Sequence, residues 1–168
     1  MTLWLVGMMG SGKTTAGKMA ASRLSVPFGD TDEAVSERMG CSVAQLWGSL
    51  GEAAFRDMEK VALVNLAGSE GIVATGGGVV LDEENRGILT ESEKVVWLVA
   101  SPTVLEMRLA STVDRPGLVS SQTRTFEFLS ELAEQRSSLY TEVATHRIST
   151  DSIDVGAVAS EIVDIWTT

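Results

Sequence analysis

The chain has 168 residues, enough for one globular domain with a full hydrophobic core. Asp and Glu outnumber Lys and Arg by 23 to 13, and the formal net charge is −10. An acidic chain is not drawn over long range to nucleic acid or to an anionic membrane, so we expect neither as a partner. Any anionic ligand must therefore meet a local cluster of basic groups.

Cysteine content and the first residues of the chain bear on its compartment. Cys41 is the single cysteine, which excludes an internal disulfide and is typical of a reducing cytoplasm. No basic region precedes the first apolar residues, and these are needed for a strand, so we expect no signal peptide. No apolar stretch is long enough to span a bilayer.

Apolar runs typical of strands alternate with amphipathic segments typical of helices. The expected strands comprise residues 3–6, 26–30, 72–75, 94–100 and 146–149. The expected helices begin near residue 14 and cover 33–39, 43–47, 52–66, a short segment after Asp82, a segment after Ser101-Pro102, 126–140 and 154–166. This alternation predicts an α/β fold in three layers, with a five-stranded parallel sheet covered by helices on both faces. Residues 111–125 are polar and lack periodicity, which indicates a mobile lid.

The first strand leads directly into a complete phosphate-binding motif. Residues 7–14 read Gly-Met-Met-Gly-Ser-Gly-Lys-Thr, which is G-x-x-x-x-G-K-[ST] between a buried strand and a helix. Its backbone amides converge on phosphate oxygens, Lys13 neutralises the β- and γ-phosphates, and the Thr14 hydroxyl is a ligand for Mg²⁺. The alternative is a glycine-rich turn that binds nothing, which the strand and helix in the correct order argue against. We therefore expect the loop to bind a nucleoside triphosphate.

Acidic residues and glycines follow two other expected strands. Because ligands bind beyond the carboxyl ends of parallel strands, the phosphate loop, Asp30 with Asp32, and residues 76–78 should meet at one edge of the sheet. Thr75 stands where a second nucleotide-site strand usually ends in an acid, so Asp30 is the expected carboxylate near Mg²⁺. Asp32 could orient or deprotonate an acceptor hydroxyl. The alternative for both acids is a simple helix N-cap.

Several arginines could supply the local positive charge. Arg56 follows Phe55 one turn into a helix, beside Trp47, where the two rings could form an apolar wall and Arg56 part of a clamp for a small ring-shaped acid. Arg136 is a second candidate for that clamp. The lid carries Arg115, which could stabilise transferring phosphate, while Arg108 precedes the lid and could stack on adenine. His146, the only histidine, has no recognisable acid–base partner and is expected to be structural.

In order and spacing, these motifs resemble the shikimate kinase family over nearly the whole chain. The resemblance is carried by the phosphate loop, Asp30-Thr31-Asp32, Gly51-Glu52…Phe55-Arg56, Gly76-Gly77-Gly78, Arg115-Pro116 and Arg136…Tyr140. It implies a P-loop domain of the nucleoside monophosphate kinase-like class over residues 1–168. It also implies an enzyme that uses Mg²⁺ and ATP to phosphorylate the 3-hydroxyl of shikimate. We expect this enzyme to be cytoplasmic and, by default, a monomer.

The same resemblance implies a role for each matching residue. The catalytic residues would be Asp32, Lys13 and Arg115. ATP would be bound by Gly10, Ser11, Gly12, Lys13, Thr14, Thr15, Arg108 and Arg115, and Mg²⁺ by Thr14 and Asp30. Shikimate would be bound by Asp32, Arg56, Gly76, Gly77, Gly78 and Arg136.

Some positions depart from the family pattern. Gly117 follows Arg-Pro in the lid where an apolar residue is usual, which should loosen the hinge. Residues 153–155 read Ile-Asp-Val where many members carry an Arg and a Pro beside adenine, which bears on nucleotide affinity and choice. Trp47 stands where phenylalanine is common, so its larger ring could tighten or reshape the acid pocket.

Three other functions fit parts of the pattern. A kinase of another polyol acid, such as gluconate, could share the fold but would not need the Phe55 and Trp47 wall. A regulatory nucleotide-binding module that has lost catalysis is disfavoured by the intact set of Lys13, Asp30, Asp32 and Arg115. A nucleoside monophosphate kinase would need a second base pocket, for which we find no counterpart.

Overall fold

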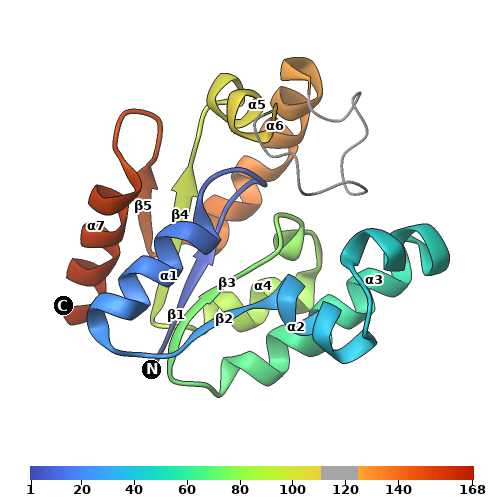
Figure 1. Cartoon of the computed structure of the whole chain (residues 1–168), viewed down its shortest axis with the longest axis horizontal. Helices are drawn as coiled ribbons and strands as arrows, with labels where there is room; N and C mark the ends of the chain where they lie inside the picture. The colour runs from blue at the N-terminus through green and yellow to red at the C-terminus, as the bar shows by residue number, and fades with distance from the viewer. Residues whose placement is uncertain (111–124) are drawn as a thin grey trace.

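The computed structural model describes residues 1–110 and 125–168 and places five strands in one sheet (Figure 1). All pairings are parallel, and the order is β2-β3-β1-β4-β5. The strands are β1 (Thr2–Val6), β2 (Phe28–Asp30), β3 (Gly71–Ala74), β4 (Lys94–Val99) and β5 (His146–Ser149). The predicted parallel sheet is confirmed, with each strand within two residues of its expected bounds.

Helices cover both faces of this sheet, as the sequence predicts (Figure 1). On one face lie α1 (Lys13–Leu24) and α7 (Val155–Thr167), which pack on each other. The other helical elements are α2 (Thr31–Met39), α3 (Val43–Ala67), the 3₁₀ turn η1 (Val79–Leu81), α4 (Glu83–Thr90), α5 (Pro102–Ala110) and α6 (Phe126–Val143). The short turn η1 is the one element in the described part of the chain that we did not expect. None of the helices described is both long and apolar enough to cross a membrane.

Side chains of β1 alternate between two cores, one on each face of the sheet. Leu3 and Leu5 are fully buried against α1 and α7, in a cluster completed by side chains such as Ala20 and Ile162. Trp4 and Val6 point to the opposite face and join the core formed with α3 to α6. Because both faces of β1 are buried, its four consecutive apolar residues read as a continuous run rather than an alternating pattern.

Polar side chains begin most of the helices, and several lie where the sequence predicts them. Asp154 accepts hydrogen bonds from the backbone of the first turn of α7, and Ser42 and Gln45 form a reciprocal capping box at the start of α3. Asp82 caps α4, and the Ser101 hydroxyl accepts from Val104 N in the first turn of α5. These caps satisfy amides that a helix leaves without partners at its N-terminus.

The interruption of α3 is narrower than we predicted. We expected residues 48–51 to separate two helices, but the helix continues through Gly48 and only Gly51 leaves the helical conformation, with φ 82° and ψ 171°. That conformation is almost exclusive to glycine. Gly51 thus changes the direction of the chain between Trp47 and Phe55.

The predicted lid, residues 111–125, lies almost entirely outside the described residues. Of this segment the structure describes Thr125, whose side chain accepts a hydrogen bond from Phe128 N and so caps α6. The expectations for Arg115 and Gly117 therefore stay predictions.

The kink in α3 yields a test of the backbone argument. Replacing Gly51 with Ala should lower the free energy of unfolding by about 1–3 kcal/mol, because a Cβ is strained at that φ and ψ. Gly48 is the matched control, since it is helical and no atom lies within 4 Å of its added Cβ. Gly48→Ala should raise the free energy of unfolding by about 0.5–1 kcal/mol. Urea denaturation measures both, and equal effects of the two substitutions would contradict the assignment of the kink to Gly51.

Candidate active site

The phosphate loop connects β1 to α1 and folds around the ammonium group of Lys13. Lys13 Nζ lies 2.7 Å from Gly7 O and 2.9 Å from Met8 O, to both of which it donates, and the residue is only 8% exposed. Gly10 and Gly12 adopt φ values of 80° and 94°, which favour glycine. This backbone curves the loop so that its amides and Lys13 can surround an anion at the start of α1.

Asp30 joins two of the predicted motifs. Its Oδ2 accepts a hydrogen bond of 2.9 Å from the Thr14 hydroxyl, and its Oδ1 accepts from the backbone of Asp32 and Glu33 at the start of α2. The two readings of Asp30, helix cap and metal-site acid, are therefore compatible in one side chain. A hydroxyl and a carboxylate side by side are the hard oxygen donors that Mg²⁺ prefers. Among the residues described no group of three or more His, Cys, Asp and Glu side chains could hold a metal, so other ligands would have to come from phosphate and water.

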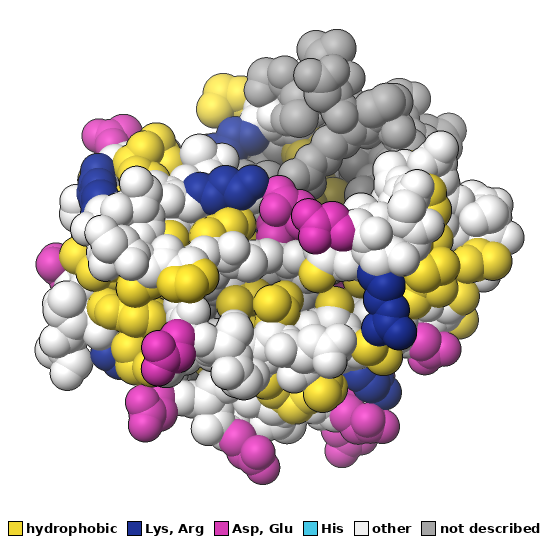
Figure 2. Space-filling view, turned by 60° about the horizontal axis from the view of Figure 1, so that its bottom comes forward, with side chains coloured by type: hydrophobic (Ala, Val, Ile, Leu, Met, Phe, Trp, Pro, Cys, Tyr) yellow, Lys and Arg dark blue, Asp and Glu magenta, His cyan; other side chains and the backbone are white. Residues whose placement is uncertain are grey.

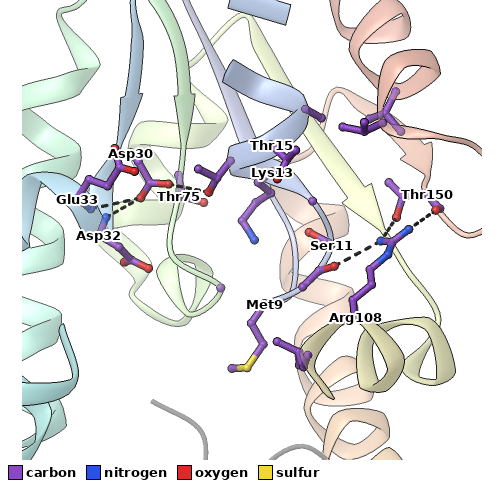
Figure 3. A pocket seen from close by; sticks show the side chains of 18 of the residues that line it. Met9, Ser11, Lys13, Thr15, Asp30, Asp32, Glu33, Thr75, Arg108 and Thr150 are labelled. Atoms are coloured by element: carbon purple, nitrogen blue, oxygen red, sulfur yellow. Dashed lines mark hydrogen bonds between the residues drawn. The ribbon is translucent and has the colours of Figure 1, made fainter. Parts of the chain in front are cut away.

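A cavity of about 1000 Å³ extends from this acidic corner across the phosphate loop (Figure 3). Asp30, Asp32 and Glu33 lie on one side of it, Arg108 and Thr150 on the other, and Lys13 between them. Its lining includes all the residues predicted to bind ATP that fall in the described ranges, namely Gly10, Ser11, Gly12, Lys13, Thr14, Thr15 and Arg108. The space is large enough for a nucleotide. Of the residues predicted to bind the acceptor, Asp32 and Gly77 line this cavity, whereas Arg56, Gly76, Gly78 and Arg136 do not.

Arg108 ties the phosphate loop to the end of β5. Its guanidinium donates to Gly10 O at 3.3 Å, to Thr150 Oγ1 at 2.9 Å and to Thr150 O at 2.6 Å. Ile153 and Val155, two of the positions that depart from the family pattern, line the same cavity. This end therefore combines a planar cation with apolar side chains, which suits the flat face of a nucleobase.

Beyond the carboxyl end of β3, two of the three glycines, Gly76 and Gly78, lie against charged side chains from α2 and α3. A Cβ on Gly76 would overlap Glu59 Oε1 and lie 2.8 Å from Asp32 Oδ1, and a Cβ on Gly78 would overlap the guanidinium of Arg56. The amide of Gly76 donates to the Thr31 hydroxyl at 2.9 Å. A side chain at Gly76 or Gly78 would therefore displace the carboxylates or the guanidinium from their present positions.

Arg56 is held by two carboxylates and two aromatic rings. Its guanidinium forms ion pairs of 2.7 Å with Glu59 and 3.2 Å with Glu52, and lies 5.6 Å from the ring centre of Trp47 and 5.5 Å from that of Phe55. The rings themselves are 5.8 Å apart. Burial disfavours its charge, but Glu59 and Glu52 outweigh that effect and raise the pKa of Arg56 above its ordinary value. The predicted apolar wall of Trp47 and Phe55 and the predicted cation of Arg56 therefore lie next to one another.

Arg136 reaches the same glycine loop from α6. It is 8% exposed, and its guanidinium donates to Gly77 O at 3.0 Å. Arg56 at Gly78 and Arg136 at Gly77 thus approach one peptide unit from two helices that are distant in sequence. Two guanidinium groups close to one another are the kind of donors that bind a carboxylate.

Because the chain carries a net charge of −10, the individual cations of this site decide where an anion can bind. The face in Figure 2 shows Asp and Glu side chains around its lower rim and a few separate Lys and Arg side chains, without a continuous basic area. Attraction of an anion must consequently come from the individual arginines, Lys13 and the backbone amides. His146 is exposed and contacts Thr145, away from the cavity lining.

The chain was next compared with known proteins. A family model described as shikimate kinase matches residues 9–167. The chain belongs to the shikimate kinase family.

Individual relatives agree over nearly the full length. The shikimate kinase of Vibrio parahaemolyticus is 40% identical over 165 residues, which are 96% of this chain and 93% of that protein. The shikimate kinase of Geobacter sulfurreducens is 41% identical over 159 residues, covering 94% and 86% of the two chains.

Solved shikimate kinases share the fold. The structure from Acinetobacter baumannii in complex with shikimate superposes with a TM-score of 0.90 at 31% identity, covering 99% of this chain and 92% of that chain. The structure from Bacteroides thetaiotaomicron gives a TM-score of 0.87 at 30% identity, covering 99% and 98%. The expected nucleoside monophosphate kinase-like fold is confirmed.

Sequence reasoning assigned no role to several residues that build this site, although Thr31 and Tyr140 stand in the motifs that carry the family resemblance. Glu59 is fully buried beside Arg56, Thr31 holds Gly76, and Tyr140 donates to Gly77 O. Helical spacing could have indicated two of them, because Glu59 is three residues after Arg56 and Tyr140 is four residues after Arg136. The contribution of Thr31 depends on which strands are neighbours, which local patterns do not contain.

The two carboxylates on Arg56 should differ in importance. Glu59 is buried and Glu52 is exposed, although both contact the same guanidinium. Glu59→Gln should lower the free energy of unfolding by about 1–3 kcal/mol, because the partly buried guanidinium of Arg56 then loses its buried carboxylate partner and keeps only the exposed Glu52. Glu52→Gln, the matched control, should change it by less than about 0.5 kcal/mol. Urea denaturation would contradict this ranking if the two substitutions had the same effect.

Proposed function

We propose that this protein transfers the γ-phosphate of ATP to the 3-hydroxyl of shikimate, giving shikimate 3-phosphate and ADP on the chorismate route to aromatic amino acids. The observation that carries the proposal is the pair of arginines, Arg56 and Arg136, which meet at one peptide next to a phosphate loop. A hydroxylated ring with a single carboxylate matches such a pocket. Membership of the shikimate kinase family supports the same activity.

The phosphate loop and the end of β5 would hold ATP. The amides of residues 10–15 would surround the β-phosphate, and Lys13 would exchange its carbonyl partners in the loop for phosphate oxygens. Arg108 would stack on adenine with Ile153 and Val155 opposite it. Arg115, outside the described residues, would add positive charge to the transferring phosphoryl group.

The pair formed by Thr14 and Asp30 fits a magnesium ion, since it offers adjacent oxygen ligands at the edge of the phosphate loop. Bound there together with the nucleotide, Mg²⁺ would neutralise charge on the phosphates. Asp30 would keep its role as the cap of α2, because Oδ1 and Oδ2 serve different partners.

The arginines and Asp32 would orient the acceptor. Arg56 and Arg136 would bind the carboxylate, the backbone at residues 76–78 would contact the ring, and the wall of Trp47 and Phe55 would lie behind Arg56. This arrangement would turn one hydroxyl toward Asp32 and the end of the ATP chain. Binding energy at the carboxylate is thereby used to position the reacting oxygen.

In the reaction, the 3-oxygen of shikimate bonds to the γ-phosphorus as the bond to the β–γ bridging oxygen breaks, and ADP leaves with that electron pair. Asp32 accepts the hydroxyl proton. Lys13 and Arg115 stabilise charge on the transferring group, which requires little covalent assistance. Catalysis would therefore come chiefly from position and electrostatics.

We also propose that the enzyme works as a monomer in the cytoplasm. The phosphate loop, Asp32, Arg56 and Arg136 all come from one chain, so no second copy is needed to complete the site. ATP is available in that compartment, and the single free thiol of Cys41 is compatible with it.

The direct test is release of ADP from Mg-ATP with shikimate, gluconate, quinate, AMP or no acceptor. Turnover with shikimate alone is expected, because its compact ring and single carboxylate suit the aromatic wall and both arginines. Turnover with gluconate instead would favour another polyol-acid kinase. Binding of ATP without turnover of any acceptor would favour a regulatory module.

Two substitutions separate binding of the acid from chemistry. Arg136→Ala should raise KM for shikimate about 10- to 100-fold with a smaller effect on kcat, because it removes charged hydrogen bonds to the carboxylate. Asp32→Asn should mainly lower kcat, by about 100-fold or more, because it removes the proton acceptor. Arg23→Ala, on the surface of α1, serves as the control arginine. Steady-state kinetics showing small, equal changes in both constants would refute these roles.

A further inference from the structure

Tyr140, the only tyrosine of the chain, lies beside the glycine loop at residues 76–78 and is not among the residues predicted to bind shikimate. It is 1% exposed on α6, and its hydroxyl donates to Gly77 O at 2.6 Å. Arg136, one helical turn earlier, donates to the same oxygen at 3.0 Å. A carbonyl oxygen has two lone pairs and accepts both bonds.

These bonds fix the orientation of the peptide between Gly77 and Gly78. No peptide bond in the described chain is cis, and in a trans peptide the C=O and the following N–H point in opposite directions. With its carbonyl directed at α6, this peptide must direct the Gly78 N–H away from α6. Gly78, at the end of this peptide, packs against the guanidinium of Arg56. Arg136 from α6 and Arg56 from α3 therefore both contact the Gly77–Gly78 segment.

The phenol itself is held by the sheet rather than by a loop. Its ring stacks on Trp97 of β4, with centroids 5.4 Å apart and planes inclined by 25°. The guanidinium of Arg147 on β5 lies 5.0 Å from the Trp97 ring centre. Burial raises the pKa of Tyr140 far above its ordinary value, so the hydroxyl keeps its proton and remains a donor.

We propose that Tyr140 is a positioning residue for the acceptor: it holds the Gly77–Gly78 peptide in place while Arg136 binds the carboxylate. Arg136 donates one N–H, on Nη1, to the Gly77 carbonyl, and its guanidinium carries further N–H groups that can donate to an acid. Tyr140 supplies a neutral donor that keeps the carbonyl in place when the guanidinium turns to the acid. The Gly78 N–H is thereby kept directed away from α6. The inference rests on the proposed phosphorylation of shikimate.

Tyr140→Phe tests the inference because it removes one oxygen atom and leaves the stacked ring. The KM for shikimate and its dissociation constant by calorimetry should each rise about 3- to 10-fold, the equivalent of one neutral hydrogen bond. The KM for ATP and kcat should change by less than roughly twofold, because the phosphate loop is untouched. The ratio of variant to wild-type KM should be constant between about pH 6.5 and 8.5, since a phenol with a raised pKa does not titrate there.

Leu132→Ala is the matched structural control, because Leu132 is on the same helix and packs on the same core. It should lower Tm and leave the KM for shikimate unchanged. Trp97→Leu, which removes the stacked ring and keeps the hydroxyl, should raise the KM for shikimate selectively, and decides the matter if Tyr140→Phe does not fold. An unchanged KM for shikimate, or equal rises for both substrates, would overturn the proposal. Failure of the wild type to use shikimate would instead refute the proposed function.

Discussion

The direct contact between the glycine loop and the phosphate loop is the constraint on which the site depends. A Cβ on Gly77 would lie 3.1 Å from the backbone nitrogen of Met9, so the two loops approach as closely as glycine allows. Parallel pairing of β1 with β3 creates this approach, since Leu5 is in register with Ala74 and accepts from the Thr75 amide just beyond it. Because β1 and β3 end at the same edge of the sheet, the proposed phosphate site and the proposed acceptor site are adjacent.

The protein is acidic overall, and the positive charge of its proposed site comes from a few individual side chains. The anions that the enzyme would bind meet Lys13, Arg56 and Arg136, each of which is held by partners within the fold. Glu59 is the least expected of those partners: burial raises the pKa of Glu59, while the cation of Arg56 opposes that rise. Fixing the cations in advance lowers the conformational cost of binding an acid and suits catalysis by position.

Local patterns predicted the layers, the caps at Ser42 and Asp154 and the motif residues, because these depend on spacing along the chain. They placed the break in α3 too broadly, since only the backbone shows that Gly51 alone is non-helical. They did not predict the hydrogen bonds of Tyr140 and Thr31, whose partners lie 63 and 45 residues away in the sequence. Such contacts depend on strand order and on the helix that crosses the sheet, which no local pattern specifies. The lid stays a prediction because residues 111–124 are outside the described ranges.

The central claim is that two arginines bind one carboxylate and thereby place a hydroxyl at Asp32. The most direct measurement is kcat/KM of the wild-type enzyme for shikimate and for its methyl ester, which keeps the ring and hydroxyls but has no negative charge. Loss of two charge-assisted hydrogen bonds, about 1.5–3 kcal/mol each, predicts a fall in kcat/KM of roughly 100-fold or more for the ester. Equal values for the acid and the ester would contradict the account, because the arginines would then have no part in positioning the acceptor.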